Sequence, residues 1–218
     1  MTRSLPLTRS ACPALCAAWG IAVLAVLLSA GQALAEGDGW TAQTYPLSRA
    51  IVHAAVTDKI AHTGHRSLLL SVRLNGQVKG YREGEAFVDL RFNPPAGANA
   101  PVNMSHSTLS AWVYCPAGLE GPRSNPNGVR LFVKDNRWHS EYGPWTHLAP
   151  GKWVQVGLSP TLSAPATGYV DKGFDPRMII SVGVSIAVGG HSSARFIGDM
   201  AIDDVTWGPG PVKYGFED

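Results

Sequence analysis

The sequence is poor in charged residues and poor in cysteine. Lys, Arg, Asp and Glu together make up 16% of the 218 residues, whereas Gly (24) and Pro (16) are plentiful. A coiled coil needs a large excess of Ala, Glu, Lys, Leu and Arg, and general disorder needs fewer apolar residues than the 45% found here. The composition therefore predicts a folded, turn-rich protein.

Excess positive charge is lacking over most of the chain. Arg3 and Arg9 are the only charged residues among the first 35, so residues 36–218 hold 16 Lys and Arg (18 minus 2) against 16 Asp and Glu. A neutral region of this kind has no basic stripe with which to neutralise phosphates. We therefore expect no nucleic-acid partner.

Long apolar runs are also lacking, except for residues 21–28 (IAVLAVLL). This run follows two arginines and precedes residues 33–35 (ALA), the small-x-small pattern that signal peptidase accepts. A Gly-Gln pair interrupts it before it reaches the roughly 20 residues that a membrane anchor needs. We predict a cleaved signal peptide over 1–35 and a secreted domain, extracellular or periplasmic, over 36–218, with no membrane partner after cleavage.

Cysteine becomes scarcer still after this cleavage. Cys12 and Cys16 would leave with the signal peptide, and Cys115 would remain alone, so an intramolecular disulfide is excluded. Cys115 lies in an apolar strand pattern, so we interpret it as a small buried hydrophobic residue rather than as a nucleophile. A domain of this length can bury about 70% of its unfolded surface, so a core alone can hold the fold.

From residue 49 onward the apolar residues alternate with period two, and no window of a dozen residues has a convincing helical period. The predicted strands are 49–56, 67–74, 86–92, 108–115, 128–134, 152–158, 178–188 and 195–207. Long loops rich in Gly, Pro and Asn favour a jelly roll over a meander. We predict one all-β domain, a β-sandwich jelly roll of two antiparallel sheets.

The alternation also predicts which side chains share a face. The predicted core residues are Leu68, Leu70, Val72, Leu74, Val88, Leu90, Phe92, Leu109, Ala111, Val113, Cys115, Val129, Leu131, Val133, Met178, Ile180, Val182, Val184 and Ile186. Trp153 and Trp207 are also expected in the core. Opposite the core phase, small residues at 181, 183, 185 and 187 would leave room for a groove.

Large aromatic and charged residues share the phase opposite the core. Aromatic rings stack on the apolar faces of sugars, and Asp or Arg side chains hold sugar hydroxyls. The predicted ligand-binding residues on strands are Asp89, Arg91, Trp112, Tyr114 and Arg130, and those in the loop 135–151 are Trp138, Tyr142 and Trp145. The strands are expected to be neighbours. The alternative is that these rings fill a second, smaller core or pack under a loop.

Three segments resemble elements of the galactose-binding-like carbohydrate-binding modules. Residues 62–68 (HTGHRSL) resemble the family's tG-x-x-SL element, residues 149–156 (APGKWVQV) its pG-x-W-x-x-v strand, and residues 198–205 (GDMAIDDV) its closing iDDV strand. They occur in the family's order and span most of the predicted mature domain. The resemblance implies a β-jelly-roll, usually non-catalytic, that binds polysaccharide on a concave sheet face or through loops.

The same resemblance implies a structural calcium ion near the place where the two ends of the chain meet. The matching acid is Asp203, and Glu36 or Glu217 is the candidate for the second carboxylate. Loop carbonyl oxygens would complete such a set, because Ca²⁺ prefers hard oxygen ligands. The alternative for Asp203 is an exposed strand carboxylate.

The resulting prediction is a secreted, monomeric, non-catalytic module that binds a polysaccharide or oligosaccharide. A first alternative is a small polysaccharide lyase or glycoside hydrolase that uses the 137–147 loop, where Arg137, His139, Tyr142 and His147 could supply a base and a cation. A second alternative is a surface interaction or adhesin domain. No catalytic residue is assigned, and enzymatic activity stays an open question.

Overall fold

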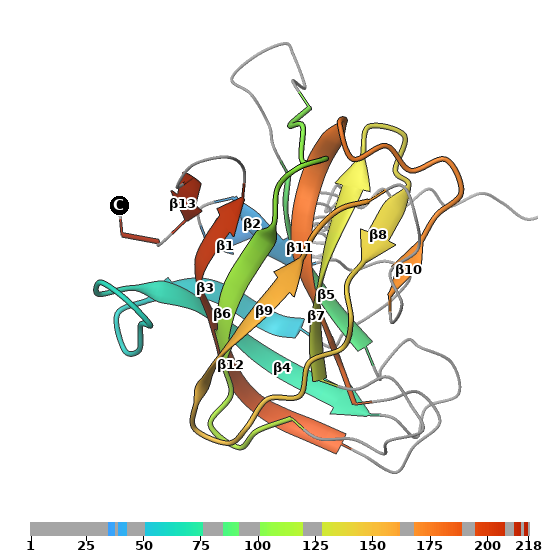
Figure 1. Cartoon of the computed structure of the whole chain (residues 1–218). Coiled ribbons are helices and arrows are strands. Elements are labelled where there is room, and N and C mark those ends of the chain that lie inside the picture. Colours follow the sequence, from blue (N-terminus) through green and yellow to red (C-terminus); the bar gives the residue numbers. More distant parts are fainter. Residues whose placement is uncertain are drawn as a thin grey trace, which may run out of the picture. The chain divides into compact units, whose positions relative to one another are not determined.

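Every regular element in the described part of the chain is a β-strand, as Figure 1 shows for the computed structural model. The predicted signal peptide lies outside the described residues, apart from Ala35, and stays a prediction. The described residues all belong to the unit formed by 33–218. They are 35–37, 39–42, 51–75, 85–91, 101–119, 128–161, 168–188, 195–207, 212–214 and 216–217.

The strands form two antiparallel sheets. The seven-stranded sheet has the order β1 (Ala35–Gly37), β2 (Trp40–Ala42), β5 (Glu85–Arg91), β11 (Ile179–Ala187), β7 (Gly128–Asp135), β8 (Ser140–Tyr142) and β10 (Tyr169–Val170). The six-stranded sheet has the order β3 (Ile51–Thr57), β4 (Ser67–Asn75), β12 (Arg195–Trp207), β6 (Leu109–Tyr114) and β9 (Trp153–Leu158), with β13 (Val212–Tyr214) paired to β12. The predicted all-β sandwich is confirmed.

The core lies where the predicted phase places it. Leu68, Leu70, Val113 and Leu131 are all buried in one hydrophobic cluster that both sheets line. Cys115 is buried as well, donates its S–H to the carbonyl of Gly118 at 3.2 Å, and has its pKa raised by that burial. These residues confirm the interpretation of Cys115 as a small hydrophobe.

Strand β11 departs from the predicted phase at its start. Its register shifts between Ile179 and Ser181, so Ile179 is buried, whereas Met178 and Ile180 are only half-buried. The predicted core position of Met178 and Ile180 is therefore wrong. An extra residue in one strand turns every preceding side chain to the other face, which an alternation pattern cannot reveal.

Trp207 is buried as predicted, but Trp153 is not a core residue. Trp153 lies opposite Tyr114 on the outward face of the six-stranded sheet and is half-buried. Phe92 lies outside the described residues. Among the described residues, no helix is long and apolar enough to cross a membrane.

Candidate functional site

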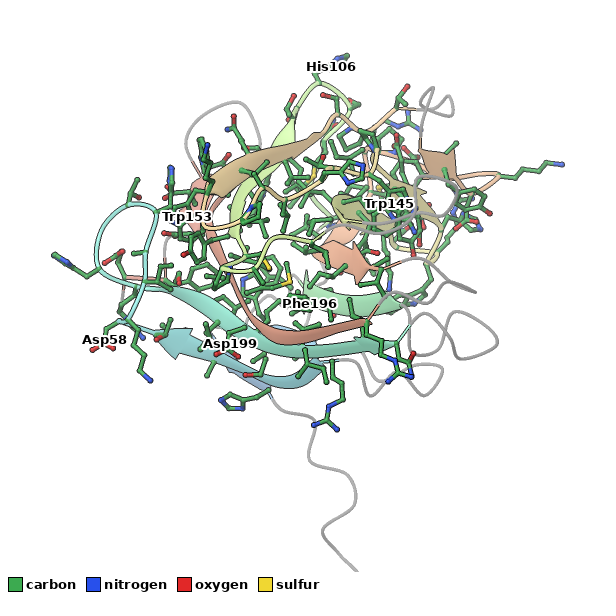
Figure 2. All side chains as sticks on the ribbon, turned by 90° about the horizontal axis from the view of Figure 1, so that it is seen from below. Asp58, His106, Trp145, Trp153, Phe196 and Asp199 are labelled. Atoms are coloured by element: carbon green, nitrogen blue, oxygen red, sulfur yellow. The ribbon has the colours of Figure 1, made fainter. Side chains whose placement is uncertain are left out.

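The predicted ligand-binding residues divide between the two sheets. Trp112 and Tyr114 lie on β6 of the six-stranded sheet, whereas Asp89 and Arg130 lie on β5 and β7 of the seven-stranded sheet. Figure 2 shows Trp145 and Trp153 well apart. The expectation of neighbouring strands is therefore wrong, because alternation assigns a side chain to the inside or outside but not to a sheet.

The expected groove over β11 is filled. Ser181 and Ser185 are fully buried, and the ring of Phe132 lies against the backbone of Gly183, where even a Cβ would collide with it. Asp89 is 0% exposed, and its carboxylate accepts hydrogen bonds from the hydroxyls of Thr41 at 3.2 Å and Ser181 at 3.1 Å. In this position Asp89 joins three strands of the sheet.

A cation lies between two aromatic rings at the β7–β8 side of the same sheet. The guanidinium carbon of Arg130 is 4.3 Å from the ring centroid of Tyr142 and 4.2 Å from that of Trp145. Contacts of this kind are worth about 0.5 to 2 kcal/mol each and fix the planes of the rings. The structure thus brings together Arg130, Tyr142 and Trp145, three of the predicted residues.

Two further aromatic residues extend this group along one row of the sheet. Phe132 on β7, Tyr142 on β8 and Tyr169 on β10 face one another in register, with ring centroids 5.4 Å and 6.3 Å apart. Residues directly opposite on paired strands share a face, so all three point outward. We call Arg130, Phe132, Tyr142, Trp145 and Tyr169 the aromatic platform.

The platform has one exposed end. Phe132 is buried, Tyr142 and Trp145 are half-buried, and Tyr169 is 55% exposed. The sequence pattern missed Tyr169, because β10 has only two residues and lies in a segment interpreted as a loop. A Tyr in a two-residue strand gives no period from which its direction can be inferred.

Trp138 lies beside the platform at the turn between β7 and β8. Its backbone has φ +66°, it donates its N–H to the carbonyl of Asp135 at 2.9 Å, and its side chain is 52% exposed. Lys134 lies between Trp138 and the platform, with Nζ 5.8 Å from the Trp138 ring centroid and 5.2 Å from that of Phe132. The side chain of Arg91 lies outside the described residues.

The four residues suggested for an enzymatic site lie in and around β8, from the turn after β7 to the segment that follows β8. Arg137 and His139 lie at the C-terminal end of β7, where their N–H groups donate to the buried carboxylate of Asp135 at 2.8 Å and 2.9 Å. His147 lies at the other end, beside Gly128. Eight strand residues separate the two ends, a distance of about 25 Å. The structure therefore does not bring the four residues to one point.

Glu141 faces inward from β8, between the sheets. Its strand neighbours in register are Val133 and Val170, and its side chain is 0% exposed. Oε2 accepts the N–H of Thr161 at 2.8 Å, while Oε1 is buried with no partner in the described part of the structure. Burial outweighs the Thr161 hydrogen bond and raises the pKa of Glu141 to about 7.

A second aromatic group lies on the outward face of the six-stranded sheet. The imidazole of His62 stacks on Trp112 with ring centroids 4.0 Å apart, and Trp153 packs beside His62 and Tyr114 at 5.5 Å and 5.4 Å. His62 Nδ1 lies 2.7 Å from Oδ2 of Asp204. These rings hold the loop after β3 against the sheet.

Trp112 is therefore expected to stabilise the fold. Replacing Trp112 with alanine should lower the free energy of unfolding by about 2 kcal/mol, less than the cost for a fully buried indole. Glycan binding should be kept, as measured by denaturant unfolding beside affinity electrophoresis. Lost binding with unchanged stability would instead support the predicted ligand contact of Trp112 and Tyr114.

The predicted calcium ligands Asp203 and Glu217 both contact the loop around residues 62–66. Asp203 is fully buried, so the alternative of an exposed carboxylate is wrong, and it accepts the N–H groups of His62, Thr63 and Asp204 at 2.7, 3.2 and 2.7 Å. Burial raises the pKa of Asp203, and these three N–H bonds oppose that rise.

Glu217 binds the next part of the loop in the same way. Its carboxylate accepts the N–H of His65 at 2.9 and 3.1 Å and that of Arg66 at 3.3 Å, and these bonds lower the pKa of Glu217. The side chain of Glu36 lies outside the described residues, and no three acidic, His or Cys side chains gather as a metal site among the described ones. The calcium ion stays a prediction of the resemblance.

Comparison with solved structures finds carbohydrate-binding modules among the structural neighbours. A family 30 carbohydrate-binding module matches with a TM-score of 0.45 and 13% identity over 76% of this chain and 76% of that one. The C-terminal family 22 module of Clostridium thermocellum Xyn10B has a TM-score of 0.40 and 13% identity, over 77% of this chain and 84% of that one. A family 22 xylan-binding domain of Paenibacillus barcinonensis has a TM-score of 0.42 and 16% identity, over 78% and 91%.

These neighbours are carbohydrate-binding modules, the class of protein that the sequence motifs resemble. No protein-family model and no curated protein matches the chain. At these identities and TM-scores the likeness carries no argument for fold or ligand, so any ligand has to follow from the residues of the site.

Proposed function

We propose that this protein is a secreted β-jelly-roll module that binds polysaccharide on the aromatic platform without cleaving it. The observation that carries the proposal is the guanidinium of Arg130 held between the rings of Tyr142 and Trp145. Rings that are fixed before binding lose little conformational entropy when a sugar stacks on them. An exposed ring at the end of the platform, Tyr169, gives the sugar access.

The platform also suits a chain of sugars better than a single one. Trp138 and Tyr169 are both more than half exposed, one at the β7–β8 turn and one on edge strand β10, next to Tyr142 of the platform. Large exposed aromatic side chains grouped on one face mark a binding surface. Successive sugars of one polymer could therefore contact successive rings.

Affinity electrophoresis across a panel of neutral and acidic polysaccharides tests this function, run beside assays for new reducing ends and for unsaturated uronate absorbance. Retardation without product supports a binder, and product supports a lyase or hydrolase. If there is neither retardation nor product, the interaction or adhesin domain is the remaining hypothesis. The predicted monomer should elute at its own mass in size-exclusion chromatography.

Variants of the platform give the sharper result. Trp145→Ala and Arg130→Met should each weaken retardation at least about tenfold, which is about 1.4 kcal/mol, because the first removes one ring and the second removes the cation that contacts both rings. Trp153→Ala, which removes a half-buried indole from the other sheet, is the matched control and should keep its affinity. Equal losses in all three variants would contradict a site on the platform.

A further inference from the structure

Tyr169 and a carboxylate beside it form a fixed pair at the exposed end of the platform. The Tyr169 hydroxyl donates to Oδ1 of Asp171 at 2.8 Å. Oδ2 of Asp171 accepts the N–H of Ser140 at 2.7 Å, and the Asp171 N–H donates to the Ser140 carbonyl at 2.9 Å. Both ends of Asp171 are thus tied to β8, and through Asp171 so is the hydroxyl of Tyr169.

The carboxylate of Asp171 can accept further hydrogen bonds. A carboxylate offers about four acceptor positions, and the described contacts of Asp171 use two of them. Asp171 is only half-buried, so solvent or a ligand can reach it. The remaining positions accept hydroxyl hydrogens, whereas a second carboxylate placed there would be repelled.

The charge of the whole region agrees with an uncharged ligand. Residues 36–218 hold 16 positive and 16 negative side chains, Arg3 and Arg9 being the other two of the 18 Lys and Arg. The cations of this surface lie against aromatic rings: the guanidinium carbon of Arg130 is 4.3 Å and 4.2 Å from the ring centroids of Tyr142 and Trp145, and Nζ of Lys134 is 5.2 Å from that of Phe132. Stacking and hydroxyl recognition, rather than attraction between charges, are then left to carry the affinity.

We propose that Tyr169 and Asp171 form a subsite for an uncharged sugar residue, which stacks on the Tyr169 ring and donates hydroxyl hydrogen bonds to Asp171. This subsite rests on the proposed polysaccharide-binding function. It implies that the ligands of the protein are neutral polysaccharides. Binding through such contacts depends little on salt, because screening weakens interactions between exposed charges and not ring stacking.

The test compares a retained neutral polysaccharide with its carboxymethylated form, using wild type, Tyr169→Ala, Tyr169→Phe and Asp171→Asn. Wild type should bind the neutral polymer at least about tenfold more tightly, the difference that one well-placed repulsive contact of about 1.4 kcal/mol gives. Tyr169→Ala should lose about tenfold in affinity, whereas Tyr169→Phe keeps its ring and most of the affinity. Asp171→Asn should bring the two polymers toward equal affinity.

Three results would overturn the subsite. Undiminished binding by Tyr169→Ala, when Trp145→Ala has lost its binding, removes the subsite and leaves the proposed function in place. A preference of wild type for the carboxymethylated polymer removes the assignment to neutral sugars. Absence of retardation by every polymer removes the proposed function together with the subsite. Circular dichroism of each variant establishes that it is folded.

Discussion

Replacing Glu141 with glutamine is expected to stabilise the protein by about 3 kcal/mol at pH 8 and to change its stability little at pH 4. The pKa of Glu141 is raised from 4.5 to about 7 by burial between the sheets. Between pH 4.5 and about 7, Glu141 of the folded protein therefore keeps a proton that the unfolded chain has already released. Glutamine is neutral at every pH and keeps an oxygen for the N–H of Thr161.

The sign follows from proton linkage. Between pH 4.5 and about 7 the folded state holds more protons at Glu141 than the unfolded state, so wild-type stability falls as the pH rises. The contribution is fully present below pH 4.5 and has been lost once the pH is above about 7. Urea unfolding of wild type and Glu141→Gln at intervals from pH 4 to 8 measures this difference.

Asp175→Asn is the control for this experiment. Its pKa is lowered to about 2 by hydrogen bonds from Arg177, so the stability it contributes is present above pH 4 and is lost only as the pH falls toward 2. This variant should therefore keep the wild-type slope between pH 5 and 8. A Glu141→Gln variant with that same slope would show that Glu141 ionises normally.

Replacing Asp203 with alanine is expected to lower the free energy of unfolding by about 3 kcal/mol or more. The substitution removes the acceptor of three N–H groups, from His62, Thr63 and Asp204, beneath a loop that also holds the His62–Trp112 stack. The bond to the Asp204 N–H is buried and those to His62 and Thr63 are part-buried, and a buried N–H that loses its acceptor costs about 1 to 3 kcal/mol. Denaturant unfolding at pH 7 measures the loss.

Asp199→Asn is the matched control on the same strand. Asp199 is exposed and accepts the hydroxyl of Ser71 on β4 at 2.7 Å, so its replacement should change stability by less than about 0.5 kcal/mol. A loss for Asp203→Ala no larger than that of the control would mean that the loop does not depend on this carboxylate.

Wild type and the Asp203→Ala variant also test the calcium prediction. If Asp203 holds the ion, chelation should lower the free energy of unfolding of wild type by about 2.7 kcal/mol, starting from free metal at a hundred times its Kd. The Asp203→Ala variant should then not respond. An unchanged unfolding curve of wild type, with metal analysis showing none bound, would remove calcium from the account.

The long strands could be predicted from sequence because alternation is a local property. Each of the eight predicted strands is found within two residues at both ends, from β4 (Ser67–Asn75) to β12 (Arg195–Trp207). The pairing of strands is not local. Asp89 and Trp112 have the same outward phase, and only the sheet order shows that they lie on different sheets.

The candidate site was harder to predict because short strands build much of it. Strands β8 and β10 have three and two residues, too few to show a period, yet they direct Tyr142 and Tyr169 outward and Glu141 inward. Sequence reasoning found Arg130 from the outward phase of its strand, and Tyr142 and Trp145 from an aromatic cluster in a predicted loop. It could not find Tyr169 and Asp171, whose roles depend on the pairing of β10 with β8.

The proposed function requires that the glycan bind to the seven-stranded sheet. An NMR titration of the protein with an oligosaccharide cut from a retained polymer measures this directly, through backbone amides and the side-chain N–H signals of the tryptophans. The platform predicts shifts in β7, β8, β10 and the Trp145 indole, with the indoles of Trp112 and Trp153 unmoved. Shifts confined to β6, β9 and those two indoles would contradict it.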